Sequence, residues 1–132
     1  MSSLDVTYLI DDDRIFTHLL SKQMQITNFS DTVKIFHDGD EALEYIRPIA
    51  NQPDILPSVI LLDINMPILD GWQFLDEFIK FDLKKRITIY IVSSSIDDAD
   101  RRKAASYSAV SNFYVKPITK EHLIDMIKEL QD

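Results

Sequence analysis

The sequence of 132 residues contains no cysteine, which excludes a disulfide framework and any metal site built on thiolates. This absence is consistent with a reducing compartment. No apolar run approaches the roughly 20 residues of a membrane-spanning helix. Residues 1–5 also lack the basic and apolar regions of a secretory signal. We therefore expect a cytoplasmic protein that makes no membrane contact.

Positive charge is scarce as well. The chain has 14 Lys and Arg against 22 Asp and Glu, a net charge of −8, which repels nucleic-acid phosphates and anionic membrane surfaces. We therefore expect a protein partner and no nucleic acid. The length suits one hydrophobic core, and no repeat, low-complexity tract or linker divides the chain, so residues 1–132 are predicted to form a single domain.

Apolar segments with strand character alternate with segments whose apolar residues recur at helical spacing. Strands are predicted at residues 6–10, 32–35, 59–62, 87–91 and 113–115, and helices around residues 15–20, 42–46, 74–79, 97–107 and 123–130. Pro48 ends the second helical segment, and residues 49–56 are predicted to be an irregular connection. Without hairpin signals, the pattern predicts an α/β fold: a doubly wound parallel sheet of five strands covered by five helices.

The third predicted strand carries a carboxylate at its end. Val59 to Leu62 is an uninterrupted apolar run typical of a strand buried on both faces, and Asp63 follows it directly. Met66-Pro67 ends the strand, and Asp70-Gly71 is a turn that opens the next helix. Ligands of open parallel sheets bind at this carboxyl edge. Asp63 is therefore the first candidate site residue.

Polar side chains end three further strands. Asp11 and Asp12 follow the first strand, Ser93 or Ser94 the fourth, and Lys116 the fifth. Because parallel strands end at one edge of the sheet, we expect these groups to converge with Asp63 in a single site.

Three converging carboxylates repel one another and require protonation or a cation. An all-oxygen set without cysteine favours Mg²⁺, which also recruits phosphate oxygens. Lys116 could neutralise a phosphoryl oxygen while a serine hydroxyl donates to another. Asp63 is then the nucleophile that forms an aspartyl phosphate.

In this order the residues resemble the receiver domains of two-component response regulators, in particular the stand-alone chemotaxis regulator. The resemblance rests on Asp11-Asp12, the Asp63-Ile64-Asn65-Met66-Pro67 block with Asp70-Gly71, the Ser93 region and Lys116-Pro117. It implies a flavodoxin-like receiver fold with strand order 2-1-3-4-5. It also implies a receiver domain over residues 1–132 without an effector domain.

The resemblance further implies a role for each matching residue. Asp63 is phosphorylated, Asp12, Asp63 and the main-chain carbonyl of Asn65 bind Mg²⁺, and Asp11 assists through water. Ser93 and Phe113 form the switch pair that turns towards the site on phosphorylation. The Lys116–Pro117 peptide bond is expected to be cis.

The switch hydroxyl lies in a run of three serines. The strand pattern favours Ser93, whereas counting back from Lys116 by the commonest family spacing favours Ser94; we assign Ser93. The Gly-Ala pair usual before the fifth strand is absent, and residues 107–110 stand there in a segment that is one residue longer.

The expected function is a phospho-acceptor switch. A sensor histidine kinase or histidine phosphotransfer protein phosphorylates Asp63, and a downstream protein reads the face of the fourth helix, fifth strand and fifth helix. We expect no enzyme activity beyond slow self-phosphorylation and autodephosphorylation. The alternatives are a Mg²⁺-dependent phosphatase or phosphotransferase with Asp63 as nucleophile, disfavoured because Asn65 occupies the acid-base position, and a phosphorylation-independent scaffold. Adaptor and phosphorelay roles both stay open.

Several polar residues are assigned structural roles. Asp13 is interpreted as a helix start, and Asp97, Asp98 and Asp100 as capping or solvated residues of the fourth helix. The basic run 101–103 is interpreted as a solvated face. Packing at the start of the third helix is expected for Trp72. Surface or core roles are expected for the histidines, His18, His37 and His122.

Overall fold

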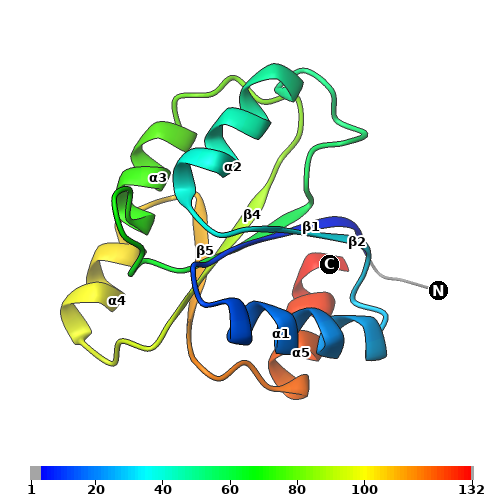
Figure 1. Ribbon diagram of the computed structural model, residues 1–132, viewed down its shortest axis with the longest axis vertical. Coiled ribbons are helices and arrows are strands. Elements are labelled where there is room, and N and C mark those ends of the chain that lie inside the picture. Colours follow the sequence, from blue (N-terminus) through cyan, green and yellow to red (C-terminus); the bar gives the residue numbers. More distant parts are fainter. Residues whose placement is uncertain (1–3, 132) are drawn as a thin grey trace.

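The computed structural model describes residues 4–131 and contains one parallel sheet in the order β2-β1-β3-β4-β5 (Figure 1). The strands are β1 (Leu4–Ile10), β2 (Ser30–Phe36), β3 (Val59–Leu62), β4 (Thr88–Ser93) and β5 (Val110–Val115). The helices are α1 (Arg14–Ile26), α2 (Gly39–Ile46), α3 (Gly71–Phe78), α4 (Asp98–Ala105) and α5 (Lys120–Gln131). This confirms the predicted fold class and strand order.

The helices divide between the two faces of the sheet. Helices α1 and α5 cover one face, and α2, α3 and α4 cover the other (Figure 1). Each layer has its own apolar core. On the α1/α5 side, the buried helical residues include Leu20, Met24, Leu123 and Met126. On the opposite side, most of the buried helical residues belong to α2 and α3.

Strand β3 lies at the centre of the sheet, as its sequence predicted. All four residues, Val59 to Leu62, are buried, and the strand pairs with β1 on one side and β4 on the other. This double burial explains why the segment is apolar without alternation. It also fixes the position of Asp63, whose amide donates to the Ile10 carbonyl at 2.9 Å.

The connection after α2 and the end of α4 differ from the sequence prediction. Arg47–Ile49 forms a single 3₁₀ turn directly after α2, because Pro48 stands near its start, where a missing amide hydrogen costs nothing. The fourth helix ends at Ala105 rather than near residue 107. The other helices occur where the apolar spacing placed them.

Carboxylates begin several of the helices at the carboxyl edge. Asp13, Asp38, Asp70 and Asp97 each accept a backbone amide hydrogen bond as the N-cap of α1, α2, α3 and α4. The capping roles expected for Asp13 and Asp97 are confirmed. Since each cap immediately follows a strand or its loop, these bonds hold the loops around the edge of the sheet in place.

The additional residue near the fifth strand lies inside β5. Ile89 pairs with Val110 and Tyr90 with Asn112, so Ser111 is the bulged residue of that strand. Ser93 pairs with Val115, and the Lys116 amide donates to the Ser93 carbonyl at 2.8 Å. The bulge therefore accounts for the extra residue between the serine run and Lys116.

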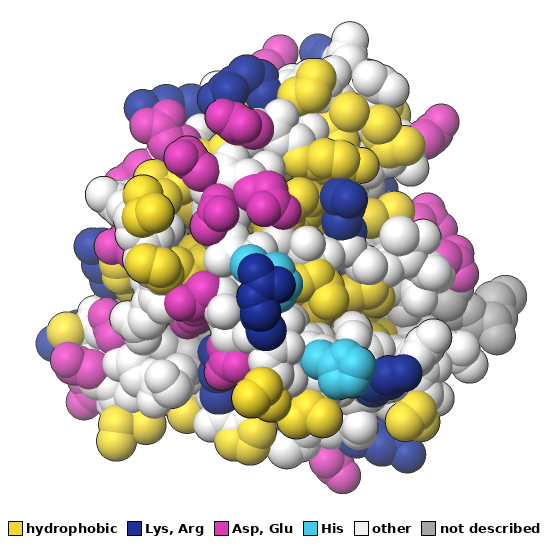
Figure 2. Space-filling model, in the orientation of Figure 1, with side chains coloured by type: hydrophobic (Ala, Val, Ile, Leu, Met, Phe, Trp, Pro, Cys, Tyr) yellow, Lys and Arg dark blue, Asp and Glu magenta, His cyan; other side chains and the backbone are white. Residues whose placement is uncertain are grey.

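The surface reflects the composition. Figure 2 shows acidic side chains spread over the face seen there, with basic side chains between them. Within residues 4–131, no helix is both long and apolar enough to span a membrane.

Candidate functional site

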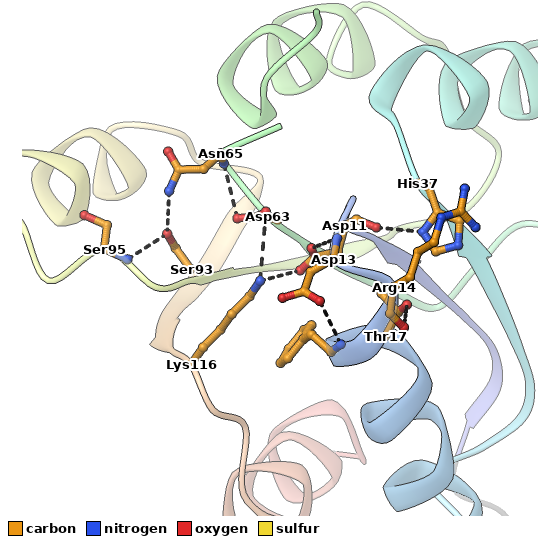
Figure 3. Close-up of polar contacts among 11 residues, drawn as sticks. Asp11, Asp13, Arg14, Thr17, His37, Asp63, Asn65, Ser93, Ser95 and Lys116 are labelled. Atoms are coloured by element: carbon orange, nitrogen blue, oxygen red, sulfur yellow. Dashed lines mark hydrogen bonds and ion pairs between the residues drawn. The ribbon is translucent and has the colours of Figure 1, made fainter. Parts of the chain in front are cut away.

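The strand ends bring the predicted side chains together at the carboxyl edge of the sheet (Figure 3). Asp11 is 3% exposed, Asp63 4% and Ser93 0%. Asp12 is exposed beside them. The convergence predicted for the ends of β1, β3, β4 and β5 is therefore observed.

Asp11, Asp12 and Asp63 form a compact carboxylate cluster. One oxygen from each lies within 4.8 Å of the others. Burial, together with the negative charge of Asp11, raises the pKa of Asp63 to about 7. Burial also raises the pKa of Asp11. Burial thus disfavours the ionised form of both carboxyl groups.

Lys116 provides the positive charge closest to the cluster among the described interactions. Its side chain extends from the end of β5, and its Nζ lies 2.8 Å from Asp11 Oδ2 and 4.0 Å from Asp63 Oδ2 (Figure 3). The Phe16 ring lies 4.2 Å from the same nitrogen and limits its access to water. Lys116 is thereby held between Asp11 and Asp63.

The cluster has the donor chemistry of a hard divalent cation. Its side-chain donors are all carboxylate oxygens, and three carboxylates lie close to a single ammonium, that of Lys116. Oxygen donors of this kind suit Mg²⁺. The residues therefore fit the predicted ion.

Asn65 links the acidic cluster to β4. Its amide nitrogen donates to Asp63 Oδ1 at 3.2 Å, and its side-chain Nδ2 donates to Ser93 Oγ at 3.3 Å. The Ser95 amide donates to the same hydroxyl oxygen at 3.1 Å. Ser93 is thus the buried hydroxyl at the site, whereas Ser94 is exposed.

The sequence prediction did not include the Asn65 side chain or Ser95. Ser95 Oγ donates to Asp100 Oδ2 at 2.6 Å, which connects the serine run to the first turn of α4. The serine run was visible in the sequence, but residue identity alone does not show which hydroxyl faces which neighbour. His37 has the structural role expected of it, but its contact was not predicted: its Nδ1 lies 3.0 Å from the Asp11 carbonyl oxygen. Its position directly after β2 was the available signal.

Phe113 lies on the inner side of β5 and is 9% exposed. The Arg101 guanidinium lies 5.0 Å from its ring centroid. A groove of about 230 Å³ runs between α4 and β5, with Phe113, Ala104 and Ala105 among its lining residues. Phe113 is therefore packed, with open space beside it.

The loop after Asp63 is tightly fitted at Gly71. A Cβ atom there would come within 2.6 Å of both the Asp63 carbonyl oxygen and the Ile64 Cα. The Gly71 amide donates to the Ile64 carbonyl at 3.1 Å. Only glycine allows this close approach. At the opposite edge of the site, the Lys116–Pro117 bond is cis, as the resemblance implied.

An acidic site at the carboxyl edge of a 2-1-3-4-5 sheet defines the class of the protein as a receiver-type α/β domain. The family model for the response regulator receiver domain matches residues 7–128. The chain belongs to this family. Members of the family act as signalling switches rather than as classical enzymes.

Individual proteins agree with this assignment. The crystal structure of a two-component response regulator from Cytophaga hutchinsonii is 28% identical and superimposes with a TM-score of 0.88 over 97% of both chains. The probable methanogenesis regulatory protein FilR2 of Methanothrix harundinacea is 25% identical over 96% of this chain and 81% of its own length. The chemotaxis protein CheY of Halobacterium salinarum is 25% identical over 92% of both. The chain spans only 14% and 48% of the length of two other curated relatives.

Proposed function

We propose that this domain is a phospho-acceptor switch in which Asp63 receives a phosphoryl group from the histidine of a sensor kinase or phosphotransfer protein. One observation carries the proposal: the buried Asp63 carboxylate accepts the Asn65 amide at one oxygen and lies 4.0 Å from the Lys116 ammonium at the other. A nucleophile held between a donor and a cation is suited to in-line phosphoryl transfer.

The residues of the site divide the chemistry between them. A carboxylate oxygen of Asp63 forms a bond to phosphorus while the bond from phosphorus to the donor's imidazole nitrogen breaks, and the electron pair stays on the imidazole. Lys116 neutralises charge on a phosphoryl oxygen. Asp12, Asp63 and the Asn65 carbonyl would hold Mg²⁺, with Asp11 acting through water. The ion, when bound, supplies further charge neutralisation at the phosphoryl oxygens.

Phosphorylation changes the partners of Ser93. Its hydroxyl oxygen accepts bonds from Asn65 and Ser95 in the unphosphorylated protein. The Ser93 hydroxyl would donate a hydrogen bond to a phosphoryl oxygen within reach, and this bond would draw the hydroxyl towards Asp63. Phe113, beside the groove under α4, has room to follow. The altered face of α4, β5 and α5 would then be read by a downstream protein, either as an adaptor or as a phosphorelay step.

Intact-protein mass after incubation with acetyl phosphate and Mg²⁺ tests this function. We expect one added phosphoryl group on the wild type, and none on Asp63→Asn or in a metal-free control. Absence of the adduct in folded, Mg²⁺-binding protein would refute the proposal. Release of phosphate over many turnovers would instead indicate a phosphatase, although Asn65 offers no group for acid-base catalysis.

A further inference from the structure

Helix α4 packs against β5, and polar and aromatic side chains make further contacts near each of its ends. Of its eight residues only Ala104 is buried. A groove of about 230 Å³ lies between α4 and β5, and beside it the Arg101 guanidinium lies 5.0 Å from the Phe113 ring centroid. Its position therefore depends on a small number of polar and aromatic contacts.

The contact at the start of α4 leads to the phospho-acceptor site. Ser95 Oγ donates to Asp100 Oδ2 in the first turn, and the Ser95 amide donates to Ser93 Oγ. This tie belongs to the switch already described.

The contact at the end of α4 involves side chains with no role in that switch. The Tyr107 ring stacks on Trp72 of α3, with centroids 5.8 Å apart and planes at 17°. The Lys103 ammonium lies 4.9 Å from the Trp72 ring centroid, and the Tyr107 hydroxyl donates to Asp76 Oδ1 at 2.8 Å. We call these four residues, Trp72, Asp76, Lys103 and Tyr107, the α3–α4 clasp.

The clasp is connected to Asp63 through the backbone. Trp72 follows Gly71, where a Cβ atom would come within 2.6 Å of both the Asp63 carbonyl oxygen and the Ile64 Cα. Because no side chain separates Gly71 from the Asp63 loop, we expect a displacement of that loop to reach the first turn of α3. The clasp joins this segment to the end of α4 without involving Ser93.

We propose that the α3–α4 clasp is a positioning device that holds the end of α4 in its unphosphorylated place and loosens when Asp63 is phosphorylated. This inference rests on the proposed function. The clasp is closed in the structure, and a shift of α4 into the groove beside Phe113 would slide Tyr107 away from Trp72. A contact made in one state only opposes the transition to the other.

Linkage gives the sign of the expected effect. If the clasp favours the unphosphorylated state, its removal raises the affinity for a phosphoryl analogue. Calorimetric titration with beryllofluoride in the presence of Mg²⁺ should show about five- to tenfold tighter binding to Tyr107→Ala, within the range of ordinary allosteric coupling. Tyr107→Phe, which keeps the ring but loses the Asp76 bond, should show a smaller gain. Tyr45→Ala, an exposed tyrosine on α2, is the matched control and should bind as the wild type does.

Trp72 gives a second readout, because it is the one tryptophan of the chain. Its quenching by acrylamide should increase when beryllofluoride binds to the wild type. Tyr107→Ala should show the increased quenching before the analogue is added.

The outcomes separate the two proposals. Simple damage to the fold weakens analogue binding, so tighter binding supports the clasp specifically. Unchanged or weaker binding to Tyr107→Ala, or to Tyr107→Phe if the alanine variant does not fold, would overturn the clasp alone. A wild-type protein that binds Mg²⁺ but neither beryllofluoride nor a phosphoryl group would refute the proposed function and this inference with it.

Discussion

Helices α3 and α4 have the same length and both follow strands that supply site residues, yet they are held in opposite ways. Of the eight residues of α3, Gly71, Phe74, Leu75 and Phe78 are buried, whereas α4 buries Ala104 alone. Apolar burial stabilises α3 over its whole inner face. Contacts of individual side chains, such as Ser95 with Asp100 and Arg101 with Phe113, contribute more of the stability of α4. The site therefore lies between a helix held by apolar burial and one that buries a single alanine.

The largest expected effect is a difference in stability between two truncated variants, one in α3 and one in α4. Phe74→Ala in α3 should lower the free energy of unfolding by about 3–5 kcal/mol, because it removes a fully buried ring and leaves a cavity. Ala104→Gly in α4 should cost only about 1 kcal/mol, the usual helix penalty of glycine. Urea denaturation measures both. Equal losses in the two variants would contradict the comparison.

Burial of the Asp63 carboxyl should lower the free energy of unfolding as the pH rises. The folded protein holds a proton on this carboxyl up to about pH 7, whereas the unfolded chain releases it near its ordinary pKa of 3.8. Between these values the folded state binds more protons, so the contribution of Asp63 to stability falls as pH rises and stays lost above about pH 7. Asp63→Asn should therefore stabilise the metal-free protein at about pH 8 by about 1–2 kcal/mol, allowing for partial screening by solvent.

Urea denaturation at about pH 5 and about pH 8, in chelator, checks this effect. The advantage of Asp63→Asn should be smaller at the lower pH, where the wild-type carboxyl is largely protonated in the fold. Mg²⁺ should stabilise the wild type more than the variant. A stabilisation that does not change with pH would show that the charge of Asp63 is not its cause.

The same contrast explains what the sequence could and could not predict. The apolar run of β3 and the acids at the strand ends are local signals, and they sufficed to place Asp63, Asp11 and Lys116 in one site. The bulge at Ser111 is different, because it lies among polar residues of an edge strand and no periodicity marks it. Contacts between α3 and the segment that follows α4, such as Trp72 with Tyr107, depend on how these elements are placed after folding. Sequence spacing carries no direct sign of that placement.

The smallest effect concerns the contact at the start of α4. Ser95→Ala removes the hydroxyl that donates to Asp100 and accepts the Asp97 amide, and it should lower the free energy of unfolding by about 0.5–1.5 kcal/mol. Ser94→Ala, at an exposed neighbour, is the matched control and should change little. Which helix is destabilised is more informative than how far the free energy of unfolding falls. Amide hydrogen exchange should accelerate in α4 and stay unchanged in α3, because a helix with little buried apolar surface opens locally when one of its contacts is removed. Uniform acceleration across both helices would mean that α4 does not open independently of α3.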